Sequence, residues 1–467
     1  MMRWSRRARR QLSPVAALLS SVLLTSGAPS ASDARELDAR DAVSGGVSPA
    51  FRQAAPPGVT LSAATNPAAA HGLARLQEMP EIDELVTRAI RAGRTPGAVV
   101  IVGRRSGVVF RRAYGRRAIV PEREEMTVDT IFDLASLTKP LVVATLVQWL
   151  IENGRLDIHE RAVKYLPEFG VRDKYLVSVE QLLLHTSGLP PTNTLRDYWH
   201  GAKRARELAL GGWLYKYPGR EFIYSDLGYI ALGEMIESIT GERLDATAER
   251  VIWKPLGMLD TRYCPTLCDD PRIAPTELNH GWAKNPIRGQ PSDTRVFRLG
   301  GVAGNAGVFS SADDVARFAR MVLGEGELDG VRVLSPERVR DMNHPRPVPK
   351  ATRALGWDVS SGFSSARGHE LSPEAVGHGG YTGTSLWIDP VQDLFVVFLS
   401  NRNHPFSTGR VTDLQGHVAD AAVRALRLEG EHARGGEPGL SDSVLHRACS
   451  GGAAGCPARQ GLPGAGG

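Results

Sequence analysis

The sequence predicts an α+β fold: an antiparallel sheet made from N- and C-terminal hairpins, flanked by helices and carrying an inserted, mainly helical lobe. Runs of β-branched residues surround a short turn near each end of the folded sequence, which predicts the two hairpins. Helical patterns and loops fill the sequence between them, which predicts the lobe. With 467 residues, of which 42% are hydrophobic and 23% charged, the chain can bury a large core.

Residues 1–31 have the pattern of a signal peptide. Five arginines and no acidic residue precede an apolar stretch at 15–24, which is too short to span a bilayer. Small residues follow, and they predict cleavage between Ala28 and Ala31. The alternative is an uncleaved membrane anchor. We expect an exported protein, periplasmic or extracellular, without stable membrane insertion once the signal is removed.

Charge and cysteine content narrow the function classes. The formal net charge of +5 equals that of the five leader arginines, so the remaining chain is near neutral and indicates no nucleic-acid partner. The four cysteines form two close pairs, Cys264/Cys268 and Cys449/Cys456. An even number in an exported chain favours local disulfides, with free thiols as the alternative. A zinc site at the first pair would need further ligands, and His280 is the only histidine nearby. We therefore predict no metal and no cofactor.

Three segments follow the signal. Residues 32–75 are rich in Ala, Pro, Ser and Gly without a period, which predicts a disordered linker. The folded domain is expected at 76–428. Residues 429–467 form a low-complexity tail, expected to be disordered unless the second cysteine pair ties it.

Periodicity and turn residues predict the elements of the domain. A glycine-rich run at 300–307 lacks the pattern of a phosphate-binding loop and indicates tight backbone turns instead. A proline- and glycine-rich stretch at 273–299 predicts a long ordered loop. The other predicted elements, in chain order, are a helix at 81–90, a hairpin of 97–103 with 108–115, a helix ending at 153–154, a helix that ends in a tight loop within 179–190, a helical block at 226–259, a capped helix at 315–323, a hairpin of 384–389 with 394–400, and a helix at about 411–426.

The first candidate for chemistry is Ser136 with Lys139, three residues later and followed by the long apolar run. On a helix this spacing places both side chains on one face. A serine hydroxyl is a poor nucleophile until a base removes its proton, and a desolvated lysine amine can do so. The alternative is that Ser136 only caps the helix.

Two further segments carry candidate groups. Tyr224 precedes Asp226 at a loop-to-helix junction, where a tyrosine near a lysine could relay protons. The alternative is that Tyr224 packs in the core and Asp226 is an N-cap. In 376–385, four glycines beside His378 leave a strand open to close approach by a ligand. His185, at a helix end, is more simply explained by hydrogen bonds to the backbone than by a role as base.

Taken in order, Ser136-Leu137-Thr138-Lys139, Tyr224-Ser225-Asp226 and His378-Gly379-Gly380 resemble the three motifs of penicillin-recognising serine hydrolases. The resemblance is to the class C beta-lactamase-related and penicillin-binding-protein-like group, including its esterases and D-amino-acid-releasing peptidases. It spans about residues 80 to 428 and implies the beta-lactamase/transpeptidase-like fold.

The resemblance implies an acyl-enzyme mechanism. Ser136 would be the nucleophile, Lys139 its base, and Tyr224 the group that moves protons to the leaving group and activates water. The backbone N–H groups of Ser136 and Tyr381 would form the oxyanion hole. Asp226, His378, Gly380 and Tyr381 would line the substrate site.

Two departures from the family pattern bear on the substrate. Asp226 replaces the usual asparagine and brings a negative charge close to Lys139, which favours a protonated lysine. His378 replaces the usual lysine of the third motif and is less cationic near neutral pH, which weakens its hold on a substrate carboxylate. We expect an exported serine hydrolase acting on an ester, a beta-lactam or a cell-wall peptide. The alternative is a non-catalytic peptide- or glycan-binding protein on the same fold.

Overall fold

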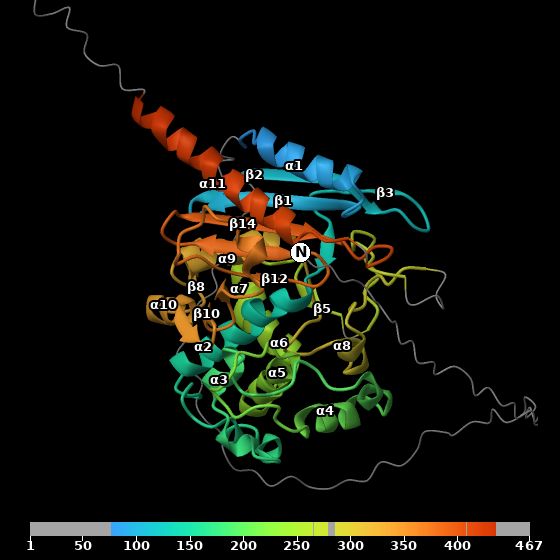
Figure 1. Cartoon of the computed structure of the whole chain (residues 1–467), viewed down its shortest axis with the longest axis vertical. Coiled ribbons are helices and arrows are strands. Elements are labelled where there is room, and N and C mark those ends of the chain that lie inside the picture. Colours follow the sequence, from blue (N-terminus) through green and yellow to red (C-terminus); the bar gives the residue numbers. More distant parts are fainter. Residues whose placement is uncertain (1–75, 265, 279–284, 408, 436–467) are drawn as a thin grey trace, which may run out of the picture. The chain divides into compact units, whose positions relative to one another are not determined.

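The computed structural model describes residues 76–264, 266–278, 285–407 and 409–435 (Figure 1). The predicted signal peptide and linker, and the Cys449/Cys456 pair, lie outside the described residues. Within the described part of the chain, no helix is long and apolar enough to cross a membrane.

Among the described residues, nine strands form the main sheet, and each neighbouring pair is antiparallel. They are β1 (Gly97–Arg104), β2 (Gly107–Ala118), β3 (Glu124–Glu125), β9 (Arg346–Val348), β10 (Ala351–Arg353), β11 (Asp358–Ser360), β12 (Val376–Gly379), β13 (Ser385–Asp389) and β14 (Leu394–Ser400). Their order is β3-β2-β1-β14-β13-β12-β11-β10-β9. The N-terminal hairpin β1–β2 and the C-terminal hairpin β13–β14 therefore meet through β1 and β14, which confirms the predicted sheet.

Both faces of the sheet are covered, which explains why β1 is an unbroken apolar run. Val100 and Val102 belong to one core cluster, together with residues of α1 (Pro80–Arg91) and α11 (Thr412–Gly435). Val99 and Ile101 point to the other face and join the larger core, which includes α9 (Ala312–Leu323). Figure 1 shows α1 and α11 lying together along the strands.

The sequence between the hairpins forms the predicted helical lobe. Its helices are α2 (Thr145–Glu152), α3 (Val179–Leu183), α4 (Ala202–Leu210), α5 (Asp226–Thr240), α6 (Leu244–Ala248), α7 (Lys254–Leu256) and α8 (Thr294–Arg298), followed by α10 (Pro336–Asn343) after α9. The apolar α5 is buried between α3, α4 and α6. A small sheet consists of β4 (Ile131–Asp133), β6 (Val308–Ser311) and β5 (Arg262–Tyr263), in the order β4-β6-β5. The chain reaches Ser136 shortly after the end of β4.

The structure also differs from the predicted elements. Strands β9, β10 and β11, and the hairpin of β7 (Glu327–Leu328) and β8 (Val331–Arg332), were not predicted, because two or three residues show no period. The predicted long loop contains the short helix α8, and α11 continues to Gly435, beyond the predicted end at 426. Cys264 and Cys268 form a disulfide, as the first of the two alternatives predicted.

Candidate active site

A strained turn presents Ser136. The chain leaves β4 and enters a 3₁₀ turn, Ala135–Leu137, in which Ala135 has a φ of 47°. A non-glycine residue in this left-handed region persists only where its surroundings hold it, at a cost of about 1–3 kcal/mol. Asp133 supplies the hold: its Oδ1 accepts the Ala135 N–H at 2.9 Å, and its Oδ2 accepts the Ser292 N–H at 2.8 Å.

Asp133 itself is almost completely buried. Burial raises its pKa to about 6, although the two backbone hydrogen bonds favour the ionised form. At neutral pH the side chain is therefore a carboxylate that accepts two backbone N–H groups. The sequence contained no signal for this role, because an aspartate that ends a strand has no distinctive pattern.

Beyond Ser136 the chain does not continue as the regular helix that the spacing suggested. The 3₁₀ turn leads into a π-helical turn, Lys139–Ala144, and only then into α2. Pro140 lies at this transition and cannot donate the backbone hydrogen bond of a regular helix. Lys139 still faces Ser136, because three residues make one turn of a 3₁₀ helix. Its Nζ donates to Ser136 Oγ at 3.0 Å.

Lys139 is fully buried and has three acceptors around its amine. Besides Ser136 Oγ, Nζ donates to the Asn305 carbonyl oxygen at 2.9 Å and lies 2.7 Å from Asp226 Oδ1. Burial favours the neutral amine, but the negative charge of Asp226, together with Tyr224, outweighs burial and raises the pKa of Lys139. Lys139 is therefore an ammonium in this structure, as the replacement of asparagine by Asp226 led us to expect.

Tyr224 lies at the junction before α5. Its ring centroid is 5.0 Å from Lys139 Nζ and 5.0 Å from the ring of Phe363. The N-cap of α5 is Ser225, whose hydroxyl accepts the Gly228 N–H, so the alternative that Asp226 is the N-cap is wrong. Asp226 is instead the first residue of the helix, and its carboxylate pairs with Lys139.

His185 packs beside Tyr224, with ring centroids 4.3 Å apart. Its Nδ1 accepts the Ser225 N–H at 3.0 Å, which assigns the proton of the neutral ring to Nε2. Burial, with smaller effects from Arg353 and Lys139, holds the pKa of His185 well below its usual value. A ring whose lone pair is already hydrogen-bonded has no free site to accept a proton. His185 therefore has a structural role at the Tyr224 junction; the sequence favoured a structural role but did not indicate the contact with Ser225.

His378 lies in β12 and is also buried. Its Nδ1 is 2.8 Å from the Gly379 carbonyl oxygen, and because a carbonyl only accepts, Nδ1 carries the proton. Burial, with the charges of Arg353 and Lys139, holds its pKa well below the usual value. His378 is therefore neutral and keeps a lone pair on Nε2. The departure from the family's lysine is larger than expected, because this ring offers a carboxylate neither charge nor donor.

The loop after His378 is tied to the serine turn. Thr382 Oγ1 donates to the Asp133 carbonyl at 2.7 Å, and Thr384 Oγ1 donates to the Leu134 carbonyl at 3.0 Å. A Cβ at Gly380 would lie 2.1 Å from Thr384 Oγ1 and 2.5 Å from the Leu134 carbonyl oxygen, so the close approach requires glycine here. The two threonines were not predicted as site residues.

A pocket of about 730 Å³ opens above these groups. Six of the seven predicted site residues line it, namely Ser136, Tyr224, Asp226, His378, Gly380 and Tyr381. Lys139 lies behind Ser136, out of solvent. The structure thus brings all seven together, and it adds Asn305, whose carbonyl belongs to the glycine-rich turn at 300–307. No group of histidine, cysteine or acidic residues suited to a metal occurs among the described residues.

Comparison with known proteins identifies the family of the chain. The beta-lactamase family profile matches residues 82–420. A protein of Escherichia coli (strain K12) named "Putative D-alanyl-D-alanine carboxypeptidase" is 30% identical over 363 residues, covering 70% of this chain and 83% of its own length. An N-acetylmuramyl-L-alanine amidase of Bacillus subtilis (strain 168) is 30% identical over 365 residues, covering 70% and 82%.

A solved structure supports the fold. EstCE1, described as a hydrolase with promiscuous acyltransferase activity, superposes with a TM-score of 0.60 at 22% identity, covering 74% of this chain and 98% of its own. The chain therefore belongs to the beta-lactamase family of serine hydrolases.

Proposed function

We propose that the protein is an exported hydrolase that cleaves an ester or amide through an acyl-enzyme on Ser136. The observation that carries the proposal is the contact of Ser136 Oγ with the buried Lys139 amine at 3.0 Å, on the floor of a pocket large enough for a small substrate. A serine that only capped a helix would have no need of a buried amine, and Ser136 caps no regular helix.

Lys139 is the proposed base. When neutral, it takes the proton of Ser136 as Oγ bonds to the substrate's carbonyl carbon. Asp226 and the Asn305 carbonyl then stabilise the ammonium that forms. The same contacts favour the ammonium before reaction, so only a small fraction of the resting enzyme holds a neutral Lys139 near pH 7, and activity rises with pH.

The oxyanion hole of the proposal consists of two backbone donors. Ser136 lies in the first turn of a 3₁₀ segment, where backbone N–H groups lack acceptors within the turn. The Tyr381 N–H has no hydrogen bond among the described residues, and the Thr382 and Thr384 contacts hold its loop against the serine turn. A donor of this kind contributes about 3 kcal/mol to transition-state stabilisation in other hydrolases.

Tyr224 completes the proton path. Lying between Lys139 and the open pocket, it passes the proton from the ammonium to the leaving group as the carbon–oxygen or carbon–nitrogen bond breaks. In the second half-reaction Tyr224 relays a proton from the attacking water to the neutral Lys139 amine. The ammonium that forms returns the proton to Ser136 Oγ as the bond between Oγ and the acyl carbon breaks, which regenerates Ser136.

Active-site labelling tests the proposal. The wild-type protein is expected to react with a fluorophosphonate probe, to form a mass adduct on Ser136, and to turn over at least one member of a panel of short-chain esters, nitrocefin and D-Ala-D-Ala peptides. Ser136→Ala, with an unchanged melting temperature, is expected to lose both label and turnover. Absence of label and of turnover in the wild type would contradict the proposal; ligand binding that survives Ser136→Ala and Lys139→Met would then point to the binding-protein alternative.

Export is tested separately. The leader pattern and the Cys264–Cys268 disulfide support it. Fractionation of cells that express the full chain is expected to place it outside the cytoplasm, with a mature N-terminus shortly after residues 28–31. An intact N-terminus on a cytoplasmic protein would contradict export without affecting the proposed chemistry.

A further inference from the structure

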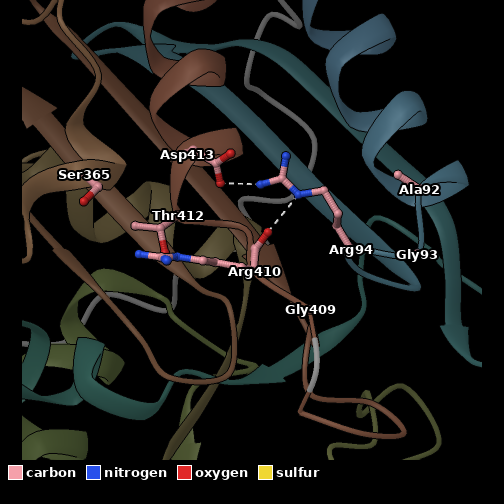
Figure 2. A pocket seen from close by; sticks show the side chains of 8 residues that line it. All are labelled: Ala92, Gly93, Arg94, Ser365, Gly409, Arg410, Thr412 and Asp413. Carbon is pink, nitrogen blue, oxygen red and sulfur yellow. Dashed lines mark hydrogen bonds and ion pairs between the residues drawn. The ribbon is translucent and has the colours of Figure 1, made fainter. Parts of the chain in front are cut away.

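The hollows outside the active-site pocket differ in their relation to it. The polar hollow around the ion pair of Arg94 and Asp413 (Figure 2) continues the active-site pocket, because the two share lining residues such as Arg410. A hollow of about 170 Å³ on the helical lobe, between the segments 172–176 and 212–221, shares no residue with that pocket. We call it the aromatic cleft. Its lining includes Arg172, Asp173, Trp213, Tyr215, Lys216 and Tyr217.

Large aromatic rings are exposed at the aromatic cleft. Trp213, Tyr215 and Tyr217 are 63%, 66% and 76% exposed, and Tyr175 on the facing segment is 53% exposed. The first three occupy alternate positions of one stretch, and all three line the cleft. A single exposed ring needs no explanation, whereas a group of them around one hollow indicates a binding site.

The backbone that carries these rings is fixed. The Gly188 carbonyl accepts the Tyr215 N–H at 2.7 Å and the Lys216 N–H at 3.2 Å. A Cβ at Gly188 would lie 2.0 Å from the Lys216 carbonyl oxygen, so this close approach requires glycine. Lys174 is fully buried and donates from Nζ to the Gly212 carbonyl, which ties the two sides of the cleft together. The rings are therefore held in place before a ligand arrives, which lowers the entropy cost of binding.

The facing side of the cleft is a strained turn. Arg172 and Asp173 have φ values of 55° and 66°, in the left-handed region that residues other than glycine rarely adopt. Strain of this kind persists only where the surroundings hold it, and it is concentrated at ligand-binding sites. The turn places the Arg172 guanidinium 5.0 Å from the centroid of the Trp213 ring. One face of that ring therefore carries a cation, and the rest of the exposed ring meets solvent.

The two segments also carry an excess of positive charge. Burial, with the charge of Arg172, lowers the pKa of Lys174 to about 8, so this lysine is still mostly protonated near pH 7. Lys216 lies 2.9 Å from a carboxylate oxygen of Glu221. Four basic residues less two acidic ones leave two positive charges, which complement a ligand with negative groups. The residues counted are Arg172, Lys174, Lys216 and Arg220 against Asp173 and Glu221.

A glycan that carries negative groups matches these features. The flat face of a pyranose ring presents C–H bonds, whose positive ends are attracted to the negative face of an aromatic ring. Three aromatic rings along one stretch can stack successive sugars of a chain, while the basic side chains meet its negative groups. An anionic membrane fits less well. Membrane-surface anchors insert an apolar face into the bilayer, whereas here tyrosines line a hollow together with charged side chains.

We infer that the aromatic cleft is a binding site for an anionic glycan, separate from the active-site pocket. The cleft holds the enzyme on a polysaccharide while the active site acts on groups attached to that polymer or close to it. Binding of this kind raises the effective concentration of substrate at the active site. Residues 185–190 connect the two sites, because Gly188 supports the cleft and His185 packs beside Tyr224. The inference goes beyond the proposed acyl-enzyme function.

Isothermal titration calorimetry with two oligosaccharides tests the inference. One is a hexasaccharide of alternating glucuronic acid and N-acetylglucosamine; the other is the neutral hexamer of N-acetylglucosamine. We expect the acidic hexasaccharide to bind, and the neutral one to bind about three- to fivefold more weakly, the effect of a few exposed charges. Added salt should reduce this difference, and Arg172→Gln should reduce it at low salt.

Variants of the rings make the result specific. Trp213→Ala and Tyr217→Ala should each weaken binding of the acidic hexasaccharide about tenfold, the scale of removing an aromatic ring on which a flat ring stacks. Trp213→Phe keeps a ring and should retain most of the affinity. Trp199→Ala is the matched control, because Trp199 is 65% exposed, lies under Arg298 at 5.2 Å and is outside the cleft. Its dissociation constant should stay within about twofold of wild type.

Absence of binding of both oligosaccharides at millimolar concentration, or an equal loss in Trp199→Ala and Trp213→Ala, would overturn the inference. Sedimentation with phosphatidylglycerol vesicles that Trp213→Ala abolishes, without oligosaccharide binding, would overturn it in favour of a membrane surface. Fluorophosphonate labelling of Ser136 should be equal in wild type and Trp213→Ala, and unchanged melting temperatures show that the variants are folded. Because binding is measured without turnover, a wild type that takes no label counts against the proposed function and leaves the binding result standing.

Discussion

The inner wall of the pocket (Ser136, Lys139 and Asp226) and its outer rim (Tyr381, Arg402 and Arg410) are built in different ways. On the inner wall, the lysine amine is fully buried and has three acceptors within 3.0 Å. On the rim, Tyr381 is 59% exposed and Arg410 has no partner among the described residues. The groups that we propose for the reaction are thus held by buried polar contacts whose loss costs free energy of unfolding, whereas water solvates the side chains of the rim.

The largest effect is expected from Lys139→Met, which removes the buried amine. Activity should fall at least about 10⁴-fold, as it does when a member of a catalytic unit is lost. The Asp226 carboxylate would lose its partner, and the free energy of unfolding should fall by about 3 kcal/mol. Steady-state kinetics and urea denaturation measure the two effects.

The double variant Lys139→Met with Asp226→Asn separates chemistry from stability. Removal of both partners leaves no unpaired charge, so stability should recover while activity stays lost. If the free energy of unfolding of the double variant is as low as that of Lys139→Met, the unpaired Asp226 carboxylate is not the cause of the lost stability.

A smaller loss is expected from Asp133→Ala, which leaves the Ala135 and Ser292 N–H groups without acceptors. Each buried unsatisfied group costs about 1–3 kcal/mol, and release of the strained Ala135 should displace Ser136. We expect kcat to fall about 100-fold with a weaker effect on KM. An unchanged kcat would show that Asp133 does not position the proposed nucleophile.

Asp133→Asn provides the pH control for the same site. The folded-state pKa of about 6 exceeds the ordinary 3.8, so the folded wild type binds more protons between these values. Its stability relative to the variant, which does not titrate, should therefore fall as the pH rises from about 4 to 6 and stay constant above that. Urea denaturation at a series of pH values measures the difference, and a rise over this window would contradict the assigned burial effect.

Asp226→Asn should shift the pH profile of activity and have a smaller effect on the maximal activity. Asp226 raises the pKa of Lys139, and the proposed mechanism requires the neutral amine. Removal of the negative charge lowers that pKa, so the ascending limb of the profile of kcat/KM against pH should move to lower pH. Movement to higher pH would exclude Lys139 as the base.

The smallest effect is expected at the rim, from Tyr381→Ala. The variant keeps the backbone N–H proposed for the oxyanion hole and loses an exposed ring that lies under Arg402. Stability should change by less than about 0.5 kcal/mol, and kcat/KM by about two- to threefold. A loss as large as that of Asp133→Ala would mean that the rim is not the adaptable part of the pocket.

The outcome for individual residues shows what sequence patterns can predict. The serine–lysine spacing, the Tyr224 junction and the glycine-rich strand are local, and the structure brings all three to one pocket. Asp133 and Asn305 escaped notice because they act through contacts that the tertiary fold creates, with Ser292 in one case and with Lys139 in the other. The Asp226 N-cap alternative was wrong because sequence spacing does not tell which of two adjacent residues, Ser225 or Asp226, caps the helix.

By itself the sequence determined the two hairpins, the helical lobe and most residues of the candidate site, because turn chemistry, hydrophobic period and motif spacing act within short stretches. Only the tertiary structure decided the charge states: Lys139 is an ammonium, and His185 and His378 are neutral with opposite tautomers. The physical reason is that burial and the approach of charges from distant segments set protonation, and neither is encoded at a fixed distance along the chain.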